Sequence, residues 1–267
     1  MVTPSATIAD MTADSWDPGQ YAKFLRERSA PFFDLLALVE PRPGMRAVDL
    51  GCGTGELTRQ LHARLGCRQT LGLDRSTKML ERSAAFAAEG LRFEKGAVES
   101  FAPDGTFDLV FSNAALHFVE GHEALWPRLA SFLAPGGQMA IHLPANQDHP
   151  THVTAREIGA EKPFAEALDG FALPTHVLPV EAYAGLFHRL GFARQSVRLV
   201  VYTHLLESRE SVLEWVKGSI LTEFQSRMTT ELYERFLDTY RRRLLPRLAD
   251  ERPYFFTFKR VLMHAAR

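Results

Sequence analysis

The residues best suited to bind a ligand are three glycines between a predicted strand and a predicted helix. The apolar residues 45–50 lead directly into Gly51, Gly53 and Gly55, and a helical pattern begins after Glu56. Glycines at such a turn permit positive φ and let a ligand approach the main chain closely. The dinucleotide fingerprint G-x-G-x-x-G requires a further glycine where this chain has Glu56. The loop therefore predicts a cofactor site that is not built for NAD.

A carboxylate at the end of the next predicted strand strengthens this interpretation. Asp74 lies 21 residues after Gly53, where a carboxylate can accept hydrogen bonds from ribose hydroxyls. Glu56 at the start of a helix would repel a pyrophosphate, but not a cofactor that carries a sulfonium and an ammonium group. The alternative is that Asp49 and Asp74 only cap the helices that follow and that the glycines only make a tight turn.

Three histidines raise the question of a metal site. His142, His149 and His152 are close in sequence, but they lack the i, i+4 spacing of a helical zinc site and flank prolines in a predicted loop. We therefore predict no metal ion.

The glycine loop belongs to a regular alternation of predicted helices and strands. An interrupted helix is expected over about 21–39, broken near Pro31. Strands are expected at 45–50, 69–73, 91–95, 107–112 and 138–143, and helices at 58–65, 77–89 and 122–133. Such alternation predicts a parallel sheet covered by helices on both faces.

The pattern changes after residue 144. Loops and short helices run to about residue 190, and a strand is predicted at 196–205. A helix follows at 208–217, in which Ser211 and Glu214 have the spacing of a capping box. Apolar residues at every fourth position predict one long helix over 224–244, and a final strand is predicted at 254–264.

Composition limits the class of protein. The chain has 267 residues, of which 46% are hydrophobic and 24% charged, as in folded globular proteins. The net charge of -1 does not favour nucleic acid as a partner. We recognise no signal peptide and no membrane-spanning run, and expect residues 1–20 to form a loose arm. The expectation is a soluble, cytoplasmic monomer or homodimer with no membrane partner.

The glycine loop and Asp74 resemble motif I and the acidic loop of the class I S-adenosylmethionine-dependent methyltransferases, over roughly residues 45–143. This resemblance implies S-adenosyl-L-methionine as the cofactor and a seven-stranded, doubly wound α/β sheet whose last two strands are antiparallel. The cofactor-binding residues that it implies are Tyr21, Asp49, Gly51, Gly53, Gly55, Asp74, Arg75, Met79, Ala97, Val98, Ser112 and Asn113.

The resemblance also assigns roles within this set. The glycines line the methionine part of the cofactor, Asp49 orders the loop, Asp74 takes the ribose, and the end of strand 107–113 meets the reacting methyl group. Ala97 stands where the family usually has an acidic residue that accepts from the adenine amine. That contact is therefore assigned either to the backbone near Ala97 or to Glu99.

Other stretches are similar to a narrower group, the trans-aconitate 2-methyltransferases, which esterify a carboxylate of a small tricarboxylic acid. Their order and spacing carry the resemblance, since no one tripeptide is specific. They are residues 16–21, 27–29, 113–117, 143–144, 150–153, 202–204, 214–216 and 258–260.

A carboxylate acceptor is already ionised at neutral pH, so the enzyme needs to position it rather than to deprotonate it. Arginine binds carboxylates through a bidentate fork, which makes Arg28 and Arg260 the expected clamps. The full set of expected substrate-binding residues is Arg28, His117, His152, His204, Trp215, Tyr254 and Arg260.

Each of these residues also has a structural alternative. Arg28 and Arg260 could form surface ion pairs, and Trp215 has the helical spacing of a core residue. His117 is the one candidate catalytic residue, because it follows the fourth strand and could bind the acceptor or act as a base. It could also simply begin a helix.

We therefore expect a single methyltransferase domain over 1–267, in which residues 145–190 and 206–250 form a helical cover over the substrate pocket. The leading hypothesis is methyl ester formation on trans-aconitate or a related polycarboxylate. Two alternatives are methyl transfer to carbon or another heteroatom of a different small acid, such as a 2-oxo acid, and a cofactor-binding protein without catalysis.

Overall fold

The structure is a computed structural model that describes residues 25–173 and 176–267, with only the backbone described for 25–28. Tyr21 and the arm expected at 1–20 lie outside the described residues. Two compact units make up the described chain. The sheet unit contains the described residues 28–145, 176–201 and 259–267, and the helical unit contains 25–27, 146–173 and 202–258.

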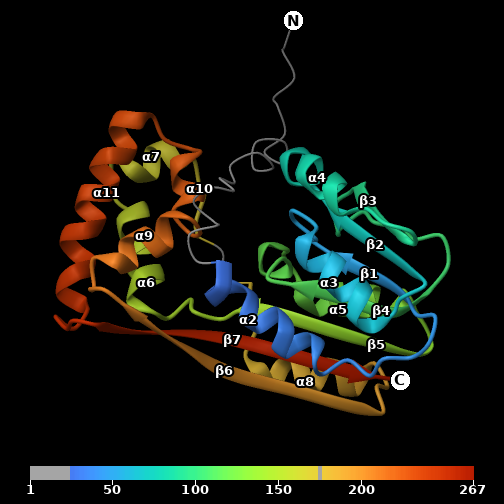
Figure 1. Cartoon of the computed structure of the whole chain (residues 1–267). Coiled ribbons are helices and arrows are strands. Elements are labelled where there is room, and N and C mark those ends of the chain that lie inside the picture. The colour runs from blue at the N-terminus through green and yellow to red at the C-terminus, as the bar shows by residue number, and fades with distance from the viewer. Residues whose placement is uncertain (1–24, 174–175) are drawn as a thin grey trace, which may run out of the picture. The chain divides into compact units, whose positions relative to one another are not determined.

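One seven-stranded sheet, shown in Figure 1, has the strand order β3-β2-β1-β4-β5-β7-β6. Its strands are β1 (Arg46–Leu50), β2 (Gln69–Asp74), β3 (Leu91–Lys95), β4 (Phe107–Asn113), β5 (Leu133–Pro144), β6 (Arg194–Leu206) and β7 (Tyr254–Ala266). The pairs β1–β2, β1–β4, β2–β3 and β4–β5 are parallel, whereas β5–β7 is antiparallel. The predicted seven-stranded, doubly wound sheet is thus confirmed, and β7 runs antiparallel to its neighbour β5.

The order of the strands creates a place for a ligand. From the central pair β1–β4 the chain continues to β2 on one side and to β5 on the other. Ligands of open α/β sheets bind at such a switch point, beyond the carboxyl ends of the strands. The glycine loop follows β1, and Asn113 ends β4.

Helices cover both faces of the sheet. On one face, α2 (Leu25–Leu36) and α3 (Glu56–Leu65) bury Phe32, Leu35 and Leu61 against β1, β4 and β5. On the other face, α5 (His122–Ser131) and α8 (Val180–Arg189) bury Trp126 and Phe187. The helical cover predicted over 145–190 does not include residues 180–189, because the apolar face of α8 packs on the sheet instead. The remaining short elements of this unit are α4 (Thr77–Ser83), η2 (Ala84–Phe86) and η3 (Leu116–Phe118).

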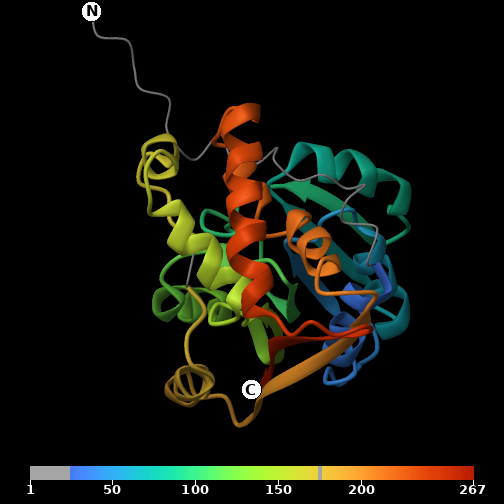
Figure 2. The same ribbon diagram turned by 90° about the vertical axis from the view of Figure 1, so that its left-hand side faces the viewer.

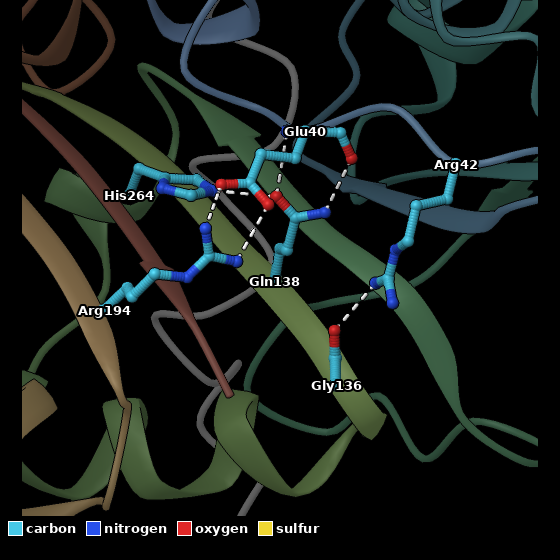
Figure 3. Close-up of polar contacts among 6 residues, drawn as sticks. All are labelled: Glu40, Arg42, Gly136, Gln138, Arg194 and His264. Atoms are coloured by element: carbon cyan, nitrogen blue, oxygen red, sulfur yellow. Dashed lines mark hydrogen bonds and ion pairs between the residues drawn. The ribbon is translucent and has the colours of Figure 1, made fainter.

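A network of polar side chains connects β5, β6, β7 and the segment before β1 near the amino end of β5 (Figure 3). Gln138 Nε2 donates to the Glu40 carbonyl (2.8 Å), and Gln138 Oε1 accepts from Glu40 N (3.0 Å) and from His264 Nε2 (2.9 Å). Both terminal nitrogens of Arg194 donate hydrogen bonds to the Glu40 carboxylate. Arg42 donates to the Gly136 carbonyl at 2.7 Å. Segments far apart in sequence are therefore joined at this edge.

The helical unit has an aromatic core of its own. Its helices are α6 (Pro150–Gly159), α7 (Phe164–Leu168), α9 (Ser211–Lys217), α10 (Thr222–Gln225) and α11 (Thr230–Leu244), followed by η4 (Leu245–Arg247). The Phe224 and Phe236 rings stack at 4.8 Å. α6 and α11 lie side by side, as Figure 2 shows, and Tyr240 Oη donates to the Thr151 carbonyl at 3.0 Å.

Several predicted element boundaries were wrong for identifiable reasons. The long helix expected over 224–244 is two helices, because the Thr229 side chain accepts from Leu232 N and caps a new start. The capping box at Ser211 does not form, since Ser211 already lies within α9 and Glu214 binds Lys217 instead. Pro31 lies inside a continuous α2.

Two further boundaries differ from the prediction. The helix expected at 77–89 ends at Ser83 and continues as a short 3₁₀ turn. β5 begins at Leu133 rather than at the predicted residue 138, and it includes Pro135, Gly136 and Gly137. None of the helices in the described ranges combines the length and the apolar character that a bilayer crossing requires.

Candidate active site

The glycine loop is held in place by close packing. Gly51 and Gly55 have φ of +79° and +80°, which side-chain-bearing residues rarely adopt. A Cβ on Gly51 would lie 2.1 Å from the Ala115 Cβ, and a Cβ on Gly55 would lie 2.7 Å from the Phe93 ring. These two glycines are therefore required by their neighbours as well as by the turn.

Gly53 differs, because a Cβ there would meet no atom of the described residues within 4 Å. Among these residues, the side of the loop at Gly53 is thus open, which leaves room for a ligand against the main chain. Gly53 N donates to Asp74 Oδ2 at 2.8 Å, and Asp74 Oδ1 accepts from Ser76 N at 2.9 Å. A carboxylate has about four lone-pair sites, so Asp74 can order the loop and still accept from a ribose. Ser76, rather than Asp74, caps α4.

Asp49 is buried beneath the loop. Its Oδ2 accepts from Thr58 Oγ1 at 2.6 Å, which joins β1 to α3. Burial raises the pKa of the Asp49 carboxyl to about 7, and the negative charge of Asp74 adds to the rise. These contacts fit the predicted role of Asp49 in ordering the loop.

The loop after β3 is held by an arginine that the sequence analysis missed. Arg128 of α5 donates to the Val98 carbonyl at 2.9 Å and also to the Phe101 carbonyl. Val98 is buried, whereas Glu99 is exposed. The Ala97 carbonyl accepts from Ser100 N at 3.2 Å. Arg128 gave no signal in the sequence, because it lies on an amphipathic helix like any surface arginine.

The end of β4 carries a chain of polar contacts. Ser112 Oγ donates to the Leu50 carbonyl at 2.7 Å and so joins the ends of β4 and β1. Asn113 Oδ1 lies 2.7 Å from His142 Nδ1, and His142 Nε2 lies 3.3 Å from Arg260 Nη1. The predicted clamp Arg260 is only 5% exposed, so it is not a surface ion-pair residue.

His117 lies in η3, on the segment that follows β4, and its ring packs on Phe118 at 3.9 Å. The carbonyl of the preceding residue, Leu116, accepts from His122 Nε2 at 2.9 Å. His122 Nδ1 in turn accepts from Tyr183 Oη at 2.6 Å. Sequence reasoning saw His122 only as a helix start, yet it is the residue that ties the His117 segment to α5 and α8.

The other expected substrate-binding residues lie in the helical unit, apart from Arg28, whose side chain is outside the described residues. Trp215 is 2% exposed and Tyr254 is also buried, so both belong to the aromatic core, the alternative that the spacing of Trp215 favoured. The buried His204 ring packs on Trp215 at 4.8 Å.

His152 shares the Thr151 hydroxyl with His149. Burial lowers the pKa of His152 to about 3, so its imidazole is neutral at physiological pH. It can therefore offer a hydrogen bond to an acid, but not a positive charge. No cluster of three or more His, Cys, Asp or Glu suited to a metal ion occurs in the part of the chain that the structure describes.

Comparison with known proteins agrees with this geometry. Residues 47–137 match a family model described as a methyltransferase domain. The YcgJ protein from Bacillus subtilis has a similar fold, with a TM-score of 0.60 and 17% identity over 89% of this chain and 97% of that one. An S-adenosylmethionine-dependent methyltransferase from Mesorhizobium loti gives a TM-score of 0.51 and 24% identity over 90% and 100%.

A curated relative decides the narrower family. The trans-aconitate 2-methyltransferase of Deinococcus radiodurans is 41% identical over 263 residues, which cover 95% of this chain and 98% of that protein. The chain belongs to the trans-aconitate 2-methyltransferase family. It is therefore an S-adenosylmethionine-dependent methyltransferase, and the open side of the loop at Gly53 together with the Asp74 carboxylate fits that cofactor.

Proposed function

We propose that this enzyme transfers a methyl group from S-adenosylmethionine to a carboxylate of trans-aconitate and releases a methyl ester. The observation that carries this proposal is the 41% identity to a trans-aconitate 2-methyltransferase along nearly the whole of both chains. The glycine loop, the buried Asp49 and the Asp74 carboxylate support the cofactor half of the reaction.

We assign the binding of the cofactor to the residues around the carboxyl ends of β1, β2 and β4. Gly51 and Gly53 offer main chain to its methionine part, and Asp74 accepts from its ribose. Arg75 and Met79 at the start of α4, together with the backbone at Ala97 and Val98, flank the adenine. When bound, S-adenosylmethionine supplies an electrophilic methyl group.

The chain's own residues then have to hold a carboxylate rather than activate it. A carboxylic acid is ionised at neutral pH, so its oxygen can attack without losing a proton to a base. Rate enhancement comes from holding the oxygen in line at near-attack distance. His117, on the segment after β4, is assigned to binding the acceptor by hydrogen bonding.

The test is incubation with methyl-labelled S-adenosylmethionine and trans-aconitate, cis-aconitate, citrate or a 2-oxo acid in turn. We expect a labelled product with trans-aconitate, and mild base should release the label as methanol, because esters hydrolyse under these conditions. A base-stable product would contradict methylation on a carboxylate. Turnover of a 2-oxo acid alone would favour methyl transfer to carbon.

A further inference from the structure

Three side chains form a polar chain inside the sheet unit that the proposed reaction does not yet use. Asn113 ends β4, His142 lies beside it on β5, and Arg260 follows on β7. His142 is fully buried, and Arg260 is nearly so. The backbone reinforces this arrangement, because Ala114 N donates to the His142 carbonyl at 3.0 Å.

The direction of each hydrogen bond in this chain follows from donor chemistry. A guanidinium has only donors, so His142 Nε2 must accept from Arg260 Nη1. The proton of a neutral imidazole then lies on Nδ1, which donates to Asn113 Oδ1 at 2.7 Å. Burial and the charge of Arg260 lower the pKa of His142 well below its usual value, and His117 acts in the same direction.

The consequence is a fixed orientation of the Asn113 amide. Its oxygen accepts a hydrogen bond from His142, so the two N–H groups of its nitrogen point away from His142. No described residue accepts a hydrogen bond from that nitrogen, and the Asn113 side chain is only half-buried. Two residues further on, Ala115 packs on Gly51 of the glycine loop. A pair of oriented donors therefore lies at the carboxyl end of β4, next to the cofactor loop.

We propose that His142 is a positioning residue, which turns the Asn113 amide so that its N–H groups bind a carboxylate in the active site. This inference rests on the proposed function, since both reactants there carry carboxylates, one on the acid acceptor and one on the methionine part of the cofactor. An amide in the opposite orientation would present its oxygen to that carboxylate and repel it. The relay from Arg260 through His142 prevents this flip.

The first experiment examines the tautomer without any substrate. Protein labelled with ¹⁵N-histidine is studied by NMR between pH 5 and 8, and His142 signals are assigned by their loss in His142→Asn, with the exposed His188→Asn as control. We expect His142 to remain neutral, with its proton on Nδ1, across this range. A proton on Nε2, or titration near the ordinary pKa of about 6.5, would overturn the proposal.

The second experiment uses two substitutions that each keep half of the relay. The amide nitrogen of His142→Asn can take the place of Nδ1 and still donate to Asn113. The amide oxygen of His142→Gln takes the place of Nε2 and still accepts from Arg260, but the donor to Asn113 is lost. We expect His142→Gln to weaken carboxylate binding about tenfold or more and His142→Asn to stay within about threefold of the wild type.

The constant that changes identifies the carboxylate. An increase in the KM for trans-aconitate with an unchanged Kd for the cofactor assigns the Asn113 donors to the acceptor. An increase in the cofactor Kd, measured by calorimetry without turnover, assigns them to the cofactor. If both constants of folded His142→Gln match those of His142→Asn, the relay has no positioning role. If the wild type does not methylate trans-aconitate, the proposed function fails, whereas the NMR and calorimetric results still decide the role of His142.

Discussion

Strands β5 and β7 are joined by polar side chains at both ends of their pairing. At the amino end of β5, Gln138, Glu40, Arg194 and His264 bind one another, and the arginine meets a carboxylate. At the carboxyl end, Arg260 binds a neutral imidazole, and the chain of contacts ends on the Asn113 amide. The first cluster is complete within the protein, whereas the second leaves donors for a ligand. We therefore expect polar groups at the amino end of β5 to serve stability, and those at its carboxyl end to serve binding.

The carboxyl groups at these two edges of the sheet, the amino edge and the carboxyl edge of β5, also differ in the direction of their pKa shifts. Burial raises the pKa of Asp49 at the carboxyl edge to about 7, whereas the Arg194 guanidinium lowers the pKa of Glu40 at the amino edge. A buried acid with a raised pKa costs stability when it ionises, and an exposed acid with a lowered pKa adds stability. The carboxyl edge thus contains an acid, Asp49, whose ionised form is disfavoured beside the glycine loop.

The largest effect that this comparison predicts is at the glycines. Gly51→Ala has to place a Cβ 2.1 Å from Ala115, in addition to the strain of its positive φ. We expect cofactor affinity to fall by about a hundredfold or more, since the loop has to move away from β4. Isothermal calorimetry with S-adenosylmethionine measures this loss.

Gly44→Ala is the matched control. Gly44 also has a positive φ, of +71°, but a Cβ there meets nothing within 4 Å among the residues that the structure describes. It should lose only about 1–2 kcal/mol of stability and bind the cofactor normally. Equal loss of affinity in the two variants would show that strain alone, and not packing on Ala115, accounts for the effect.

The next prediction concerns the pH dependence of Asp49. Burial disfavours the ionised form of its carboxyl. The contribution of Asp49 to the free energy of unfolding is therefore fully present below about pH 4 and is lost as pH rises through about 7. Asp49→Asn keeps an oxygen for Thr58 and cannot ionise. The free energy of unfolding of this variant, measured without cofactor by denaturant titration, should exceed that of the wild type at pH 8 by up to about 4 kcal/mol, and the gap should close at pH 4. A gap that does not vary with pH would contradict the raised pKa.

Breaking the polar cluster around Gln138 at the amino end of β5 should affect stability alone. Gln138→Leu leaves the Glu40 main-chain groups and His264 without their partner, which should cost about 1–3 kcal/mol in the free energy of unfolding. Because Gln138 lies at the edge opposite the glycine loop, KM and cofactor Kd of the folded variant should stay at wild-type values. A change in either constant would remove the distinction between the two edges.

The smallest effect is expected for Arg194→Ala. Its ion pair with Glu40 is exposed, so the loss should appear as a slight decrease in Tm that added salt abolishes. Since the pKa of Glu40 is lowered in the folded chain, this contribution is present above the ordinary carboxyl pKa and disappears as pH falls through the lowered value. A Tm decrease that persists in acid would point to lost packing of the arginine side chain instead.

The conformation of the glycine loop and its contact with Asp74 were predictable because their signals are local. The strand, the glycines and Asp74 lie within 30 residues, and each can be recognised from residue types and their spacing alone. The helix breaks were less predictable, because apolar spacing continues through 226–229 while the Thr229 side chain begins a new helix. The roles of Arg128 and His122 had no sequence signal, since the carbonyls that they bind belong to other elements.

The sequence by itself determined the family, the succession of strands and helices in the sheet unit and the position of the glycine loop, because glycine spacing, strand-end acids and hydrophobic periodicity are properties of short segments. Only the tertiary structure decided what Arg260 and His142 do. Their partners lie 118 and 29 residues away along the chain, and it is burial that turns one histidine from a candidate metal ligand into a neutral relay. Protonation state and hydrogen-bond direction depend on what surrounds a group in space, and no local pattern specifies that.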